Sequence, residues 1–305
     1  MEEWKYYIER NNMETQVIKA NAKINISLKV LNKRNDGYHN LDMLMATLDL
    51  CDVLYIEEIQ YNNIIIEMTE DICDLKDNVC YKMIRKIQDK YNISKGIKLS
   101  IQKNIPFGAG LGGGSADAAA LLKCLNKMWE LNMSVQEMID FSKELGSDIP
   151  YCIVQGLARV QKTGNEIIPL DIEFDKNVIL IVPDEKLSTK NVFQEFNHKD
   201  KSEKSITNAI NKFKKEGLLD TFNDLQPAAD RLTNDLIKDI INKCKAIGLN
   251  DTFMTGSGST VVVLTDKTFD IKEKVKMLES TVINAKIITT SLKMYTYWKS
   301  YNVNV

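Results

Sequence analysis

Glycine is concentrated in one short stretch of the chain, IPFGAGLGGGSAD, at residues 105–117. Five of the chain's 14 glycines fall within seven positions of it, although fixing a glycine costs more backbone entropy than fixing any other residue. Backbone N–H groups free of side chains can close around phosphate oxygens, and the start of a following helix attracts the same anion. We expect Ser115 to cap that helix. The stretch therefore predicts a binding site for an adenosine phosphate.

Three other glycine-rich motifs compete with this interpretation. A P-loop requires a lysine before the serine, but Gly114 precedes Ser115. Gly108, Gly110 and Gly113 match GxGxxG, yet a dinucleotide-binding fold needs a second parallel strand after the helix, and here a second helix is expected. A protein kinase would also need HRD and DFG, which are absent. A glycine-rich helix entry without a ligand remains the structural alternative.

Strands and helices are mixed around this loop without strict βαβ alternation, which favours an α+β fold. Apolar and polar residues alternate in the first expected strand, with Ile24, Ile26 and Leu28 on one side and Lys23 and Asn25 on the other. Before residue 171 we expect strands at 15–33, 41–50, 52–59, 62–68 and 96–106, two short strands within 151–170, and helices at 77–92, 115–130 and 134–145. After it we expect strands at 177–183 and 285–293, a strand–turn–strand unit at 251–266, and helices at 202–217, 228–248 and 271–280.

Length and composition limit the class of protein. A chain of 305 residues suggests two domains, which we place at residues 1–170 and 171–305. A net charge of -2 argues against a nucleic-acid partner, and no apolar run is long enough to span a membrane. The first residues lack the apolar core of a secretory signal. Six scattered cysteines without CxxC, and only two histidines, argue against structural zinc and favour a reducing cytoplasm.

A family resemblance rests on several stretches in order. PFGAGLGGGSADAAA resembles the phosphate-binding motif of the galactokinase, homoserine kinase, mevalonate kinase and phosphomevalonate kinase superfamily, the GHMP kinases. Residues 22–52 resemble the N-terminal signature of the 4-diphosphocytidyl-2-C-methyl-D-erythritol kinase family, and residues 145–156 its LGADVP segment. FNDLQPAA and MTGSGSTVVV resemble its later motifs. The chain departs at Ala116, where the family commonly has a second serine, so a hydroxyl there is dispensable or replaced.

The resemblance implies a two-domain GHMP kinase fold. Its N-terminal ATP-binding domain would combine a mixed sheet with helices, and its C-terminal domain would be α+β and ferredoxin-like. The implied activity is ATP-dependent phosphorylation of the 2-hydroxyl of 4-diphosphocytidyl-2-C-methyl-D-erythritol, in the non-mevalonate route to isoprenoid and terpenoid precursors. Three alternatives stay open: another GHMP kinase of homoserine or mevalonate type, a catalytically silent ligand sensor, and an NAD-dependent oxidoreductase.

The resemblance also implies the residues of phosphoryl transfer. Asp148 would be the catalytic base, because an attacking alcohol must lose its proton. Lys23 would face the same site, where its ammonium can keep Asp148 ionised and offset developing charge. Asn25 points the same way and would contact the substrate. Without the resemblance, Asp148 would be a helix-terminal turn residue and Lys23 a solvated strand lysine.

The substrate's cytosine has its own expected residues. His39 would hydrogen-bond the base and Tyr38 would line the pocket, since cytosine presents an amino donor beside acceptors. Phe193 falls where the family often has a second aromatic ring, and it could form the other wall. The alternatives are an exposed turn histidine for His39 and ordinary core packing for Phe193.

The remaining expected contacts belong to ATP and to a second glycine loop. Asn78 and Lys103 match positions near adenine or ribose, although Asn78 could simply cap its helix. Ser115 is placed to approach Mg²⁺, which we expect with ATP and without a protein metal cage. Gly256 and Ser257, in a second glycine loop, would close on the substrate, although this loop could be only a tight hairpin. The residues expected to surround the phosphates are Pro106, Gly108, Ala109, Gly110, Leu111, Gly112, Gly113, Gly114 and Ser115. We expect a monomer or a weak homodimer.

Overall fold

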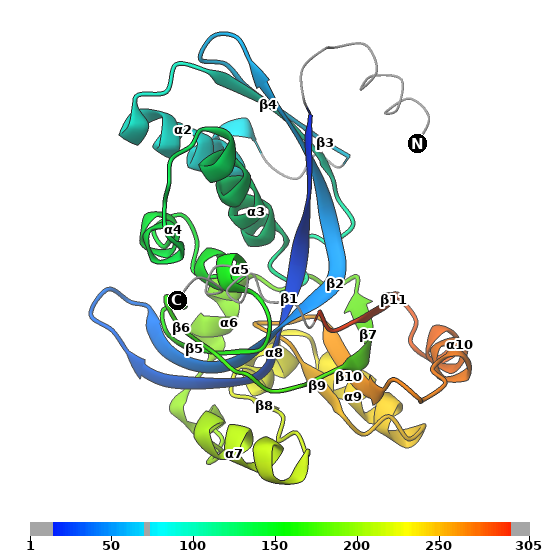
Figure 1. The fold of residues 1–305 in the computed structure, drawn as a ribbon. Coiled ribbons are helices and arrows are strands. Elements are labelled where there is room, and N and C mark those ends of the chain that lie inside the picture. Colours follow the sequence, from blue (N-terminus) through cyan, green and yellow to red (C-terminus); the bar gives the residue numbers. More distant parts are fainter. Residues whose placement is uncertain (1–14, 70–73, 294–305) are drawn as a thin grey trace.

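The computed structural model describes residues 15–69 and 74–293, which form two sheets with helices packed on them (Figure 1). The first is a seven-stranded mixed sheet with the order β3-β4-β2-β1-β8, to which β5 and β6 are added through β2. Its strands are β1 (Gln16–Lys33), β2 (His39–Ile59), β3 (Ile64–Met68), β4 (Gly96–Gln102), β5 (Ala158–Lys162), β6 (Glu166–Pro169) and β8 (Phe222–Asn223).

β1 confirms the predicted alternation, but both of its faces are covered. Ile24 and Ile26 pack into the core, while Lys23 and Asn25 on the other face are also buried. The prediction of separate strands at 41–50 and 52–59 was wrong, because β2 runs through both. Three register shifts between β1 and β2 mark irregularities of the bulge type, which bend a strand without ending it.

Helices cover one face of this sheet, and two of them begin as the sequence predicts. They are α2 (Val79–Tyr91), α3 (Gly113–Met128), α4 (Val135–Ser142) and α5 (Ile149–Val154), with the short 3₁₀ helix η1 (Leu75–Asp77) before them. The side chain of Asn78 caps α2 by accepting from the N–H of Cys80 at 2.8 Å. Ser134 and Glu137 form a reciprocal capping box at α4.

One predicted strand is a helix. Residues 151–154, expected to begin a strand, lie in α5, every residue of which is buried. A short apolar run of this kind has no periodicity that separates a buried strand from a buried helix, and Pro150 suits the first helical turn. Asp148 therefore lies directly before a helix.

The second sheet has the antiparallel order β11-β7-β10-β9. Its strands are β7 (Lys176–Pro183), β9 (Thr252–Met254), β10 (Val261–Asp266) and β11 (Ala285–Ser291). Its helices are α6 (Thr189–Glu195), η2 (His198–Asp200), α7 (Ile206–Glu216), α8 (Gln226–Leu232), α9 (Leu236–Ala246) and α10 (Lys272–Thr281). Helices connect β7 to β9 and β10 to β11, so the unit is a ferredoxin-like arrangement with extra helices, as predicted.

Two features of the second half differ from the expected pattern. The helix expected at 228–248 is divided into α8 and α9, because Asn234 and Asp235 adopt left-handed backbone angles that an α-helix cannot include. The short strand β8 leaves the second sheet and pairs in parallel with β1. The division at residues 170 and 171 stays a prediction, and β8 is the strand that crosses it.

Candidate active site

The glycine loop leads straight into α3. Gly108, Gly110 and Gly112 all have left-handed backbone angles, with φ between 71° and 74°. α3 begins at Gly113 with Gly112 at the N-cap position, so the prediction that Ser115 caps the helix was wrong. The first intrahelical bond runs from the N–H of Ala116 to the oxygen of Gly112. The N–H groups of the helix's first three residues therefore remain available for an anion.

Gly112 is required by the approach of Lys23. A methyl group at this position would lie 2.9 Å from Cγ of Lys23, and the φ of +72° adds strain for any other residue. The backbone N–H of Lys23 donates to the oxygen of Leu111 at 3.0 Å. These contacts hold the glycine loop against β1, and the Lys23 side chain packs against Gly112.

Lys23 and Asp148 meet beside the loop. The ammonium of Lys23 lies 3.3 Å from Oδ2 of Asp148 and donates to Oδ1 of Asn25 at 2.9 Å. The side chain of Lys23 is 6% exposed and that of Asp148 is 32% exposed. The carboxylate can thus receive a proton from a ligand while its cation partner stays out of water.

The second glycine loop, between β9 and β10, packs directly on the first. The hydroxyl of Thr260 donates to the oxygen of Ala109 at 2.6 Å. A methyl group on Gly110 would lie 3.0 Å from the oxygen of Gly258, so the two backbones touch. A methyl group on Gly256 would lie 3.6 Å from Nζ of Lys23. The two glycine loops and Lys23 therefore lie together, and the predicted contact of the second loop with the substrate stays a prediction.

Lys103 lies in a buried ionic cluster at the base of the glycine loop. Its ammonium contacts Asp52 and lies 2.7 Å from Oδ2 of Asp117 in the first turns of α3. Oδ1 of Asp52 also accepts the backbone N–H groups of Asn104 and Ile105, which precede the glycines. The cluster thus joins β2, the loop entrance and α3. The predicted contact of Lys103 with adenosine stays a prediction.

One cation between two carboxylates leaves the cluster short of positive charge. Burial raises the pKa of Asp117, the charge of Lys103 lowers it and that of Asp52 raises it, and together they bring this pKa to about 7. Oδ1 of Asp117 has no hydrogen-bond partner among the described residues. Burial also opposes the charge of Lys103, but the two carboxylates outweigh it and the pKa of Lys103 is raised. Asp117 is therefore the group that takes up a proton near neutral pH.

Of the three residues expected at the cytosine, His39 and Phe193 are in contact, whereas Tyr38 is largely exposed. His39, at the start of β2, stacks on Phe193 of α6 with 5.3 Å between ring centroids and 19° between planes. Phe196 contacts His39 edge-on at 6.0 Å. Tyr38 is 71% exposed. Burial lowers the pKa of His39, so its imidazole is neutral at pH 7 and can both donate and accept.

α6 links the aromatic pair to the second glycine loop. Thr189, one turn before Phe193, shares a 2.9 Å hydrogen bond between its hydroxyl and that of Ser257. Asn223 of β8 supports the same loop, since its amide donates to the oxygens of Met254 and Gly256 at 3.0 and 2.8 Å. Sequence reasoning missed Thr189 and Asn223 as site residues, although Asn223 lies within the FNDLQPAA stretch.

Two further residues expected to contact ATP, Asn78 and Pro106, lie near the first glycine loop. The side chain of Val79 would lie 3.7 Å from a methyl group on Gly114, so the start of α2 abuts the loop and Asn78 is adjacent to it. Pro106 is half-buried at the loop entrance. Within the described ranges, no group of three histidine, cysteine or acidic side chains could bind a metal ion.

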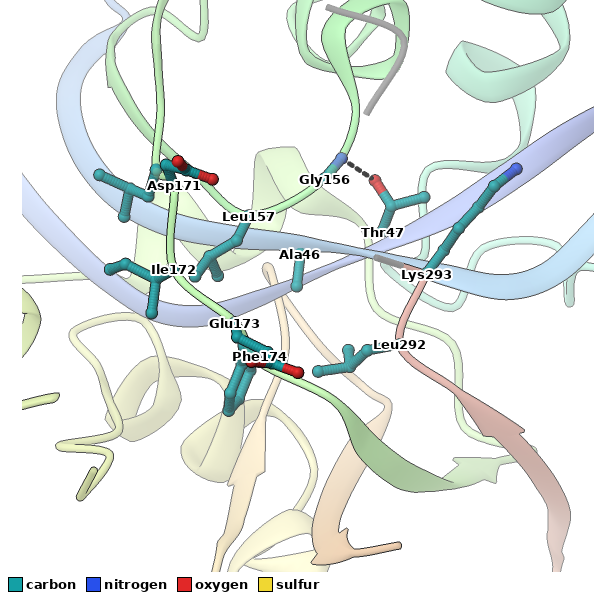
Figure 2. A pocket seen from close by; sticks show the side chains of 11 residues that line it. Ala46, Thr47, Gly156, Leu157, Asp171, Ile172, Glu173, Phe174, Leu292 and Lys293 are labelled. Atoms are coloured by element: carbon teal, nitrogen blue, oxygen red, sulfur yellow. Dashed lines mark hydrogen bonds between the residues drawn. The ribbon is translucent and has the colours of Figure 1, made fainter. Parts of the chain in front are cut away.

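A pocket of about 280 Å³ lies between β2 and the connection that enters the second half (Figure 2). Asp171, Glu173 and Lys293 contribute charged groups, and Gly156 donates to the hydroxyl of Thr47 at its wall. None of the predicted site residues lines it. In the part of the chain that the structure describes, no helix has the length and apolarity needed to cross a bilayer.

Comparison with known families first defines the class. The model of the GHMP kinases N terminal domain matches residues 78–156, and that of the GHMP kinases C terminal domain matches residues 202–284. The first match includes the glycine loop and Asp148, and the second includes both strands that flank the second loop.

Individual relatives define the family more narrowly. A 4-diphosphocytidyl-2-C-methyl-D-erythritol kinase of Caldicellulosiruptor saccharolyticus is 34% identical over 90% of this chain and 96% of its own. One of Clostridium botulinum (strain Alaska E43 / Type E3) is 38% identical over 80% of this chain and 89% of its own. A crystal structure of 4-(cytidine 5'-diphospho)-2C-methyl-D-erythritol kinase superimposes with a TM-score of 0.76 at 25% identity, covering 91% and 99% of the two chains. The chain belongs to the 4-diphosphocytidyl-2-C-methyl-D-erythritol kinase family.

Proposed function

We propose that this protein is a transferase that moves the γ-phosphoryl group of ATP to the 2-hydroxyl of 4-diphosphocytidyl-2-C-methyl-D-erythritol. The reaction belongs to the non-mevalonate route to isoprenoid precursors. Family membership supports the substrate. The observation that carries the chemistry is the 3.3 Å pair of Lys23 and Asp148 beside a loop built to bind phosphate.

The proposal assigns a role to each group of the site. Asp148 accepts the proton of the attacking hydroxyl. Lys23, whose ammonium lies 3.3 Å from Asp148 and donates to Asn25, offsets charge on the transferred group. The N–H groups at the start of α3 bind the triphosphate. Positioning and electrostatic stabilisation account for most phosphoryl-transfer catalysis, and this site supplies both.

Mg²⁺ is part of the proposal and enters with ATP. Its preferred oxygen ligands would come chiefly from phosphates and water, because the described residues form no acidic cage. The chain's own candidate is the hydroxyl of Ser115, which is partly exposed in the first turn of α3. When bound, the ion would supply positive charge that offsets the charge of the phosphates.

The division of labour between the halves is also proposed. Residues 1–170 would bind ATP, and residues 171–305 would supply the second glycine loop and Phe193. A monomer or weak homodimer would suffice, since the residues brought together all come from one chain. A cytoplasmic location agrees with the five described cysteines, none of which forms a disulfide. The pairing of His39 with Phe193 favours a nucleobase-bearing substrate over homoserine or mevalonate.

The test compares wild type with Asp148→Asn in ATP-dependent transfer to the cytidyl substrate. We expect the variant to make the phosphorylated product at least about 100-fold more slowly, with both KM values nearly kept. Asp140→Asn, an exposed change in α4, is the matched control and should keep full activity. Full activity of Asp148→Asn would remove it as the base. A folded, ATP-binding wild type without turnover would overturn the substrate, and homoserine and mevalonate would then be assayed.

A further inference from the structure

Three lysines border the first glycine loop, each against a different glycine. Two come from the strands of the first sheet or just after them, and one comes from the segment after β7 in the second half. In each pair, a methyl group on the glycine would lie within 3.6 Å of the lysine side chain. The pairs are Lys23 with Gly112, Lys103 with Gly113, and Lys186 with Gly108.

Two of these three lysines are paired with carboxylates, and the third is not paired with one in the described ranges. Lys23 is paired with Asp148, and Lys103 is shared by two buried carboxylates. Lys186 is exposed and takes part in none of the ion pairs found among the described residues. Its ammonium lies 5.4 Å from the centre of the Phe107 ring, which is itself 52% exposed. An exposed cation–π contact of this kind is weak, so little opposes a move toward a stronger anion.

The residues on either side of Lys186 contact the second glycine loop. The hydroxyl of Ser259 donates to the oxygen of Glu185 at 2.6 Å. On the other side, the Leu187 side chain would lie 3.1 Å from a methyl group on Gly258. Lys186 thus lies between two residues that contact the second glycine loop, and its side chain extends over the entrance of the first loop.

We propose that Lys186 is a phosphate ligand for ATP, contributed by the second half of the chain. A triphosphate in the first loop carries several negative charges, and the other two bordering lysines are already paired with carboxylates. The Lys186 ammonium leaves the Phe107 ring and binds the triphosphate at the Gly108 end of the loop. This inference rests on the proposed function only in assuming that ATP is the ligand of the first glycine loop.

Equilibrium binding of a non-hydrolysable ATP analogue with Mg²⁺ tests this without any acceptor substrate. Lys186→Met keeps most of the apolar stem and removes the charge. We expect it to weaken analogue binding about 10-fold or more while leaving adenosine binding unchanged. Lys186→Arg should bind nearly as wild type. Lys215→Met, which removes an exposed lysine of α7, is the charge-matched control and should have no effect.

Two results would overturn the assignment. One is wild-type analogue affinity in Lys186→Met, and the other is an equal loss of adenosine and analogue binding, which would mean altered packing rather than a lost phosphate contact. The readout separates this inference from the substrate assignment. A protein that binds the analogue through Lys186 but does not phosphorylate the cytidyl substrate would refute the proposed function alone.

Discussion

The backbone N–H of Asn25 donates to Oγ1 of Thr255 at 2.7 Å, although the two residues lie 230 positions apart. The bond is buried and joins β1, which carries Lys23, to the second glycine loop. Two halves of the chain are thereby fixed to each other next to the predicted base. The relative placement of ATP and acceptor depends on such contacts, since a small displacement of reacting groups slows transfer strongly.

Thr255→Val tests this contact. The variant keeps the volume but leaves a buried N–H without a partner, so we expect a loss of about 1–3 kcal/mol in the free energy of unfolding. Turnover should fall as well, because the second loop loses its attachment to β1. Urea denaturation and steady-state kinetics measure the two effects.

Thr265→Val is the matched control. The hydroxyl of Thr265 is buried and has no hydrogen-bond partner among the described residues, so its removal should be neutral or stabilising. Equal destabilisation by both changes would show that the Asn25 bond has no special weight.

Gly112→Ala should damage the site through Lys23. The added methyl group would lie 2.9 Å from Cγ of Lys23, in a backbone conformation that alanine adopts at a cost. We expect a loss of about 1–3 kcal/mol in stability and a fall in kcat, measured on the folded fraction. Gly217→Ala has a similar φ of +68° but nothing within 4 Å, so it separates backbone strain from the clash. If the two variants lose the same stability and both keep kcat, the close approach of Lys23 is unimportant.

The KM for the cytidyl substrate should depend on the charge of His39. Burial lowers the pKa of His39, and the positive charges of Lys33, Lys201 and His198 lower it further, so the neutral ring is the form present at pH 7. We expect KM to be constant above pH 7 and to rise as the pH falls below the usual histidine value of about 6.5. His39→Gln should abolish this rise, whereas His198→Gln should retain it. An unchanged profile in His39→Gln would exclude His39 as the titrating group.

Asp117 should make stability fall as the pH rises. Because its pKa is raised from 3.8 to about 7, the folded protein holds a proton that the unfolded chain has lost. Its stabilising contribution is thus complete below about pH 4 and disappears as the pH rises through 7. Relative to Asp117→Asn, the wild type should lose on the order of 2 kcal/mol between pH 5 and 8, measured by urea unfolding. Asp140→Asn should follow the wild-type curve over this range, and an Asp117→Asn curve parallel to that of the wild type would exclude Asp117 as the titrating group.

Local signals in the sequence predicted local structure well. Asn78 and Ser134 start their helices through side-chain caps, as short-range hydrogen bonding allows. The glycine loop was recognised, but its helix starts earlier than Ser115 because glycine itself can supply the N-cap. α5 was missed since burial on every side removes periodicity.

Contacts between segments distant in the chain could not be predicted from the sequence in the same way. Lys103 is buried between Asp52 and Asp117 because β2, the end of β4 and α3 come together in the fold. The spacing of these residues along the chain does not predict this contact. The hydrogen bond from Asn223 to the second glycine loop likewise joins segments that are distant in the sequence. The family resemblance identified Lys23 and Asp148 as candidates, and the structure adds that the two are in contact.

β8 has a consequence for how the chain is made. Its pairing with β1 means that the first sheet is completed by Phe222 and Asn223, which leave the ribosome after the whole of the first half (Figure 1). Until then, the nascent chain leaves the edge of β1 unpaired at Ser27 and Leu28, and an unpaired strand edge is the kind of surface that pairs with other chains. A fragment that stops at residue 170 would keep that edge permanently, so we expect it to aggregate where the full chain does not.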